Sequence, residues 1–122
     1  MSCRWIRVPL AAGASVAATL ALVAIAQAPA ATSNEVARGK ELFDENCLPC
    51  HGKGGGRIGT AVLAERLGPD KSLLEERKDL TPAYVSSIVR VGINIMPGFR
   101  PTEITRSDLD AISAYLTRNN PR

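Results

Sequence analysis

Two cysteines three positions apart, with a histidine directly after them, constrain this chain more than any other feature. They lie in the stretch NCLPCHG at residues 46–52. The 122-residue sequence contains three cysteines, one histidine and two methionines. Any site that uses sulfur or imidazole must therefore be assembled from a very small set of side chains, and its nature depends on how many of them the folded domain keeps.

The N-terminus has the pattern of an export signal. Arg4 and Arg7 precede the apolar run LAAGASVAATLALVAIA at residues 10–26, and small residues follow it. This order is typical of a secretory signal peptide. We expect a signal peptide over residues 1–30, cleaved near residues 28–31, and export to the periplasm. The alternative is an uncleaved membrane anchor, because the apolar run is slightly long for a signal and slightly short for a membrane span.

Removal of the signal changes the composition of residues 31–122, which we expect to form one domain. Cys3 and Met1 are lost, so the domain keeps one pair of cysteines, one histidine and one methionine. Two of the 15 basic residues are also lost, which leaves 13 against 12 acidic residues. A nearly neutral domain without a long run of like charge has no electrostatic footprint for nucleic acid, and after signal cleavage we expect no membrane contact.

A helix is predicted to lead directly into the cysteine motif. Thr32 and Glu35 have the spacing of a capping box, and apolar residues recur at helical spacing after them. This helix should run from about Asn34 to Asn46. The glycine-rich stretch GKGGGRIG at residues 52–59 lacks the signature of a phosphate-binding loop. We expect its glycines to let the backbone pass close to something flat.

Two further helices are predicted in the second half of the chain. Thr81 and Pro82 are typical of a helix start, and this helix should end before Gly92. Thr105 should cap the last helix, in which apolar residues recur at helical spacing over LDAISAYL. Residues 60–80 give weaker signals, with short helical turns expected at AVLAERLG and SLLEERKD. We therefore expect an all-α fold with three main helices and long loops.

Such a domain would have a small hydrophobic core. Its large aromatic residues are few, and the middle of the chain has little predicted structure. Small domains with a limited core commonly need an additional stabilising element. A large, apolar, planar cofactor would complete the core.

Three chemistries are possible for the cysteine motif: a redox pair, a zinc site and covalent haem attachment. A thioredoxin-like redox pair requires a βαβ context, which the predicted helix before Cys47 does not provide. A structural zinc site requires four ligands, and Cys47, Cys50 and His51 supply three. A C-x-x-C-H motif is typical of covalent haem attachment, because two thiols can add to the two vinyl groups of one porphyrin while the histidine reaches the iron. We therefore expect haem c on Cys47 and Cys50, with His51 as an iron ligand.

Met96 is the candidate for the second iron ligand. It is the methionine left after signal removal, and it lies in the Pro- and Gly-rich stretch VGINIMPGFRP between two predicted helices. With a single histidine in the chain, bis-histidine ligation is impossible, so His51 and Met96 form the expected pair. The alternative is that Met96 only fills the core.

These motifs resemble those of the class I c-type cytochromes over essentially the whole region after the signal. The similar segments are GKELFDENCLPCHG, MPGF and LDAISAYL, in this order. The resemblance implies the cytochrome c fold, wrapped around one covalently attached haem. It also implies that the first and last helices cross at four residues, Gly39, Phe43, Ile112 and Tyr115.

The chain departs from the family pattern after the glycine-rich loop. Family members often have a proline there whose preceding backbone positions the histidine, and this sequence has Gly59 and Thr60 instead. The second ring nitrogen of a ligating histidine still needs an acceptor, because that hydrogen bond fixes the ring. We expect a backbone carbonyl near Ile58 or Gly59 to accept it from His51.

The expected ligand pair indicates a single-electron carrier rather than an enzyme. With His51 and Met96 both on the iron, no position remains for substrate or oxygen. The stretch TPAYVSSIVRVGINIMPGF at residues 81–99 is similar to the cytochrome subunits of p-cresol methylhydroxylase and eugenol hydroxylase-type flavocytochromes, which implies a flavoprotein dehydrogenase as redox partner. The alternatives are a free shuttle to a terminal oxidase and a ligand-binding or catalytic haem protein with an open sixth site.

Three basic residues are candidates for contacts with the haem propionates or with a partner protein, namely Arg90, Arg100 and Lys53. We place Arg90 first. The alternative for each is a solvated surface charge, because most charged residues are exposed.

Overall fold

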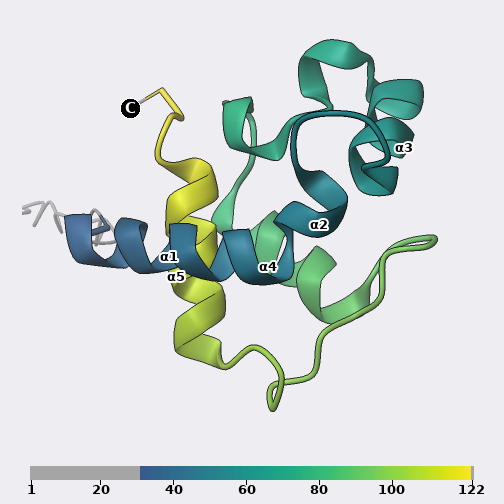
Figure 1. Ribbon diagram of the computed structural model, residues 1–122. Helices are drawn as coiled ribbons and strands as arrows, with labels where there is room; N and C mark the ends of the chain where they lie inside the picture. Colours follow the sequence, from purple (N-terminus) through teal and green to yellow (C-terminus); the bar gives the residue numbers. More distant parts are fainter. Residues whose placement is uncertain (1–30, 122) are drawn as a thin grey trace, which may run out of the picture.

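The computed structural model describes residues 31–121, which form helices joined by loops (Figure 1). In chain order the elements are α1 (Ser33–Asn46), α2 (Leu48–His51), α3 (Ile58–Leu67), the 3₁₀ turns η1 (Pro69–Lys71) and η2 (Leu74–Glu76), α4 (Pro82–Val91) and α5 (Arg106–Thr117). Within this range there is no strand, only an isolated bridge between Ile93 and Met96. The expected all-α fold is confirmed. The expected signal peptide at residues 1–30 lies outside the described residues.

Threonine side chains cap three of the helices, as the sequence predicted. The Oγ1 of Thr32 accepts a hydrogen bond from Glu35 N at 3.2 Å, and the Glu35 carboxylate accepts one from Thr32 N at 2.7 Å. Thr81 and Thr105 cap α4 and α5, each accepting from the backbone N–H three residues later. Each cap satisfies an N–H that has no partner within the helix. The starts of these helices are therefore fixed by local sequence.

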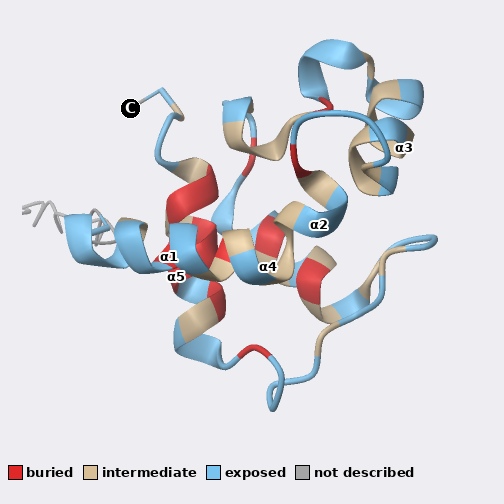
Figure 2. Ribbon diagram, in the orientation of Figure 1, coloured by how far each residue is buried: buried red, intermediate tan, exposed pale blue. Residues whose placement is uncertain are grey.

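The core forms where α1 crosses α5, and Figure 2 shows buried residues concentrated there. A Cβ built at Gly39 would lie 2.0 Å from the carbonyl oxygen of Ala111, so only a glycine lets the two backbones approach this closely. The rings of Phe43 and Tyr115 pack in a tilted arrangement with their centroids 5.7 Å apart. Ile112 is 1% exposed beside them. The crossing implied by the resemblance is confirmed at all four residues.

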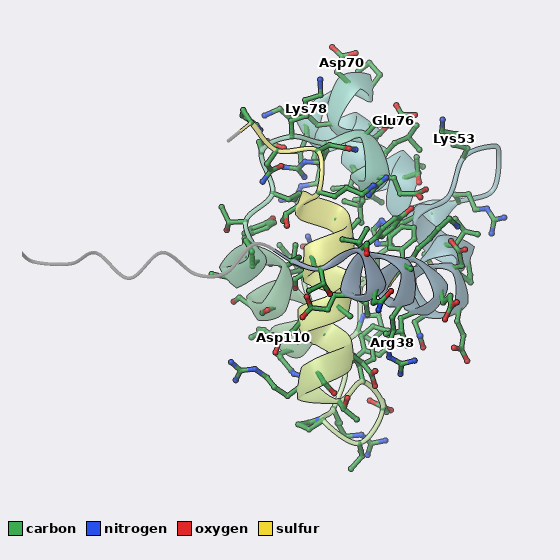
Figure 3. All side chains as sticks on the ribbon, turned by 90° about the vertical axis from the view of Figure 1, so that its left-hand side faces the viewer. Arg38, Lys53, Asp70, Glu76, Lys78 and Asp110 are labelled. Atoms are coloured by element: carbon green, nitrogen blue, oxygen red, sulfur yellow. The ribbon has the colours of Figure 1, made fainter. Side chains whose placement is uncertain are left out.

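Most charged side chains lie on the outside of the molecule, as the labelled Arg38, Asp70 and Asp110 do in Figure 3. Arg38 of α1 forms an ion pair at 2.7 Å with Asp108 of α5. Exposed pairs of this kind contribute little to stability, so packing at the crossing holds the two helices together. No helix within residues 31–121 combines the length and the apolar character needed to cross a bilayer.

The segment after the cysteine motif is more helical than the sequence predicted. α3 has ten residues and begins at Ile58, where we expected only a short turn from Ala61. Its start has no side-chain cap at Arg57, and Gly59 and Thr60 are weak helix formers, so local signals understate it. None of its residues is buried by the rest of the described chain (Figure 2). The three main helices that the sequence predicted are α1, α4 and α5, and α3 is a further helix of ten residues.

We predict that Gly39→Ala destabilises the protein, although alanine is the better helix former. The new methyl group would overlap the Ala111 carbonyl, and overpacking of this kind costs about 1–3 kcal/mol. Chemical denaturation of the purified protein measures the free energy of unfolding.

The matched control for this prediction is Gly55→Ala. No neighbouring atom lies within 4 Å of the Cβ that this substitution adds. Its effect should stay within about 0.5 kcal/mol. Equal losses of stability in the two variants would contradict a contact that is specific to the α1–α5 crossing.

Candidate functional site

A cavity of about 350 Å³ opens beside the core, within the range of roughly 300–1,000 Å³ that is usual for small-molecule and cofactor sites. Residues of α2, α3, α4 and the loop after α4 line it, and α3 and this loop lie on the same side of the molecule in Figure 1. Most of its wall is aliphatic or aromatic. The apolar lining side chains are Phe43, Ile58, Val62, Leu63, Leu67, Leu74, Leu80, Tyr84, Val85, Ile88, Val89, Ile93, Ile95, Met96, Pro97, Phe99, Ile112 and Leu116.

Five of the six large exposed apolar side chains among the described residues lie on this wall, and Val91 is the exception. Ile58, Leu67, Tyr84, Ile93 and Ile95 are between 48% and 64% exposed, and all five line the cavity. A contiguous apolar surface of this kind usually marks the site of a ligand or a partner. The wall therefore fits an apolar molecule.

One turn of chain brings Cys47, Cys50 and His51 to the cavity. α1 ends at Asn46, and the N–H groups of Cys50 and His51 donate to the Cys47 carbonyl at 3.1 and 2.8 Å. All three side chains line the cavity, and both cysteines are free thiols. Burial, followed by the influence of Cys50, raises the pKa of the Cys47 thiol to about 11, so this thiol is neutral at pH 7. Within residues 31–121, no cluster of three or more His, Cys, Asp or Glu side chains is arranged to hold a metal ion.

The imidazole of His51 is held by backbone packing. Its Nδ1 is buried and has no hydrogen-bond partner, so the expected bond to a carbonyl near Ile58 or Gly59 is absent. The reason is that α3 begins at Ile58, and carbonyls within a helix point along its axis toward the N–H four residues later. Burial lowers the pKa of His51, which keeps the ring neutral near pH 7.

Gly59 lies directly against this imidazole. A Cβ at Gly59 would come within 2.7 Å of His51 Cε1 and 2.9 Å of the Cys50 carbonyl oxygen. Two contacts brace the same region, since Thr60 Oγ1 donates to the Gly52 carbonyl and Arg57 donates to the Pro49 carbonyl, both at 2.9 Å. Gly59 thus lies against the flat imidazole, whereas a Cβ at Gly54, Gly55 or Gly56 would meet no atom within 4 Å. The expectation for the glycines of the whole stretch stays a prediction.

Met96 reaches the cavity from the loop after α4. The loop reverses in a tight turn, in which Ile93 N donates to the Met96 carbonyl at 3.1 Å and Met96 N donates to the Ile93 carbonyl at 2.9 Å. Gly92 begins the turn with a φ of +74°, and a Cβ there would lie 2.6 Å from the Met96 carbonyl oxygen. Met96 is half-buried against the core and lines the cavity. The structure thus brings Met96 to the same cavity as Cys47, Cys50 and His51.

Arg90 has a different position from the one that the sequence favoured. It is not among the described residues that line the cavity. Its guanidinium donates to the carbonyl oxygens of Phe99 at 3.1 Å and Thr105 at 3.3 Å. Arg90 therefore ties the loop after α4 to the start of α5. Lys53 and Arg100 form ion pairs with Glu76 and Glu103.

Sequence reasoning missed the two cationic residues that do line the cavity, Arg66 and Arg77. Arg66 lies in the last turn of α3. The Arg77 side chain is 9% exposed and forms an ion pair with Asp79. In the sequence, the spacing of Arg77 and Asp79 could indicate an ion pair between them. Only the fold shows that Arg77 lines the cavity.

Comparisons with known proteins agree with this geometry. Residues 34–116 match the family model described as cytochrome c oxidase, cbb3-type, subunit III. A cytochrome c6 of Cyanidioschyzon merolae (strain NIES-3377 / 10D) is 30% identical over 86 residues, which cover 67% of this chain and 72% of the relative. A cytochrome c6 of Leptolyngbya boryana is 27% identical over 82 residues, which cover 67% of this chain and 89% of the relative.

We predict that Gly59→Ala destabilises the protein, against the usual gain of about 1 kcal/mol for this substitution within a helix. The new methyl group would press on the His51 ring and the Cys50 carbonyl. Chemical denaturation gives the free energy of unfolding, and NMR of the His51 ring protons reports the displacement. Gly55→Ala again serves as the control. A stabilised variant with an unmoved ring would show that α3 does not position the imidazole.

Proposed function

The chain belongs to the c-type cytochromes, in the family of the cbb3-type subunit III model, and on this premise we propose that Cys47, Cys50, His51 and Met96 hold its haem. The family binds haem c covalently, with its iron, and the chain is a haem-based electron carrier rather than an enzyme. The haem supplies the redox chemistry, because its iron takes up and releases one electron.

A single observation carries the proposal, namely the convergence of these four side chains on one apolar cavity. The four enter from two segments, the α1–α2 junction and the loop after α4. The wall between them is apolar and partly exposed, as a planar macrocycle requires. The residues present therefore fit haem.

The two thiols are the proposed attachment points. Each of Cys47 and Cys50 would form one carbon–sulfur bond by addition across a vinyl group, with the thiol proton passing to the other vinyl carbon. The α2 turn between the two cysteines sets their separation. Such covalent attachment holds a cofactor in a small domain whose protein core is limited.

His51 and Met96 are the residues that would ligate the haem iron. The neutral His51 ring keeps a free lone pair, which metal ligation requires. Because Nδ1 is buried, Nε2 is the nitrogen that would bind the iron. A histidine and methionine pair raises the reduction potential relative to other haem ligand sets, so the protein should accept electrons readily. With both positions filled, neither substrate nor oxygen would bind.

The periplasm is the proposed location, and a flavoprotein dehydrogenase is the proposed electron donor. The signal-like pattern over residues 1–30 supports export. The similarity of residues 81–99 to cytochrome subunits of flavocytochromes supports the donor. A second candidate is electron delivery to a terminal oxidase, because the matching family model is described as an oxidase subunit.

We predict that Met96→Ala leaves the haem covalently attached but opens the sixth coordination site. The alanine has no donor atom, so the ferrous variant should bind carbon monoxide rapidly and lose potential, whereas the native ferrous protein should resist carbon monoxide. Absorption spectra and redox titration measure both effects. Ile95→Ala is the control, because it removes a neighbouring lining side chain that has no donor. Rapid binding of carbon monoxide by the native protein would instead favour the ligand-binding or catalytic alternative.

The partner is tested by gentle purification of the native protein from its host. We expect a flavin-bearing subunit to co-elute in a fixed ratio with the haem. Flavin fluorescence and haem absorbance of the same fractions measure this ratio. A haem protein that elutes alone as a monomer would contradict a tightly bound dehydrogenase and favour the shuttle to a terminal oxidase.

A further inference from the structure

The wall of the cavity carries charge of one sign only. Among the described residues that line it, the charged side chains are Arg66 and Arg77, and none is a carboxylate. Arg66 is exposed, whereas the Arg77 side chain is 9% exposed. A nearly buried guanidinium on an apolar wall needs anionic partners, because an unpaired charge is costly to bury.

The Asp79 carboxylate accepts hydrogen bonds from two of the three nitrogens of this guanidinium. Nε of Arg77 donates to Oδ1 of Asp79 at 2.8 Å, and Nη2 donates to Oδ2 at 3.0 Å, the two-point geometry that arginine and a carboxylate favour. Lys71 donates to the same Oδ2 at 3.0 Å. The hydrogen bonds from Arg77 and then Lys71 hold the pKa of the Asp79 carboxyl well below its usual range. Two cations thus share one carboxylate, and the cluster keeps a net positive charge.

Within the described chain, one nitrogen of this guanidinium is left without a partner, on a residue that lines the cavity. Nη1 of Arg77 has no hydrogen-bond partner among the described residues. Leu74 and Leu80, on either side of Arg77 in the sequence, also line the cavity. This segment therefore borders the space proposed for the haem, whose only anionic groups are its two propionates.

Resting on the proposed function, we propose that Arg77 binds a haem propionate through Nη1 and that Asp79 is the residue that positions the guanidinium. The assignment replaces Arg90, whose donors are engaged by the carbonyls of Phe99 and Thr105. Arginine suits this role because its planar fork can bind two carboxylates along different edges.

The two residues should shift the reduction potential in opposite directions. Ferric haem carries one more positive charge than ferrous haem, so a nearby cation favours the ferrous state and a nearby anion favours the ferric state. Loss of Arg77 should lower the potential. Asp79→Asn removes the negative charge but keeps a side-chain oxygen that can accept from the Arg77 guanidinium, so it should raise the potential. A merely structural role would move both variants the same way, because water entering a loosened pocket favours ferric iron.

The experiment compares Arg77→Gln and Asp79→Asn in the full, haem-loaded protein by redox titration. Lys78→Gln is the control, because it removes the same charge from an exposed neighbouring residue (Figure 3), where solvent and salt screen it. We expect a lower potential for Arg77→Gln, a higher one for Asp79→Asn and a smaller shift for the control. Redox infrared difference spectra should show a shifted propionate carboxylate band in Arg77→Gln.

Two outcomes would overturn the assignment. One is a shift of the same sign in Arg77→Gln and Asp79→Asn, and the other is an Arg77→Gln shift no larger than that of the control. Failure of the proposed function is distinguishable, because the wild-type protein would then lack a covalently attached haem. If the wild-type protein carries attached haem but Arg77→Gln leaves the reduction potential unchanged, only the proposed propionate contact is contradicted.

Discussion

The approach of α1 to α5 at Gly39 is the contact on which the rest of the structure depends. The absence of a side chain there brings the α1 backbone against the Ala111 carbonyl and lets Phe43 pack on Tyr115. Closely packed protein interiors do not deform continuously. The helix α1 therefore has one position along α5. Because Cys47 follows the last residue of α1 directly, the same contact fixes where the cysteine motif enters the cavity.

The stability of α3 depends on what covers the cavity wall. α3 places Ile58, Val62, Leu63 and Leu67 on that wall, and none of its residues is buried by the rest of the described chain. A helix of ten residues is marginal in water without tertiary packing. A bound haem would supply that packing, so cofactor attachment and the stability of α3 would be coupled. This coupling explains how a core concentrated at one helix crossing can support the whole domain.

Features set by neighbouring residues could be predicted from the sequence, and features set by distant packing could not. The three threonine caps follow from local hydrogen bonds, and the cysteine motif and the Met96 loop from counting and spacing. α3 was underestimated because its start has no side-chain cap and contains Gly59 and Thr60, which are weak helix formers. The acceptor for His51 was wrongly predicted because the first residue of α3 decides where nearby carbonyls point. The sequence could not predict which arginine lines the cavity, as Arg77 does, and which one ties a loop, as Arg90 does, because only tertiary contacts distinguish the two.

The two proposed iron ligands are positioned by backbone contacts rather than by side-chain networks. The α3 backbone at Gly59 lies against the His51 ring, and the chain at Gly92 folds back on the Met96 carbonyl. A packed backbone moves less than a free side chain, so both donor atoms would be held in place before and after each electron transfer. Preorganised ligands suit a carrier, because its iron can change charge without rearranging its surroundings. Glycine lowers local helix or loop stability, and here that cost falls at the positions where a side chain would displace a ligand.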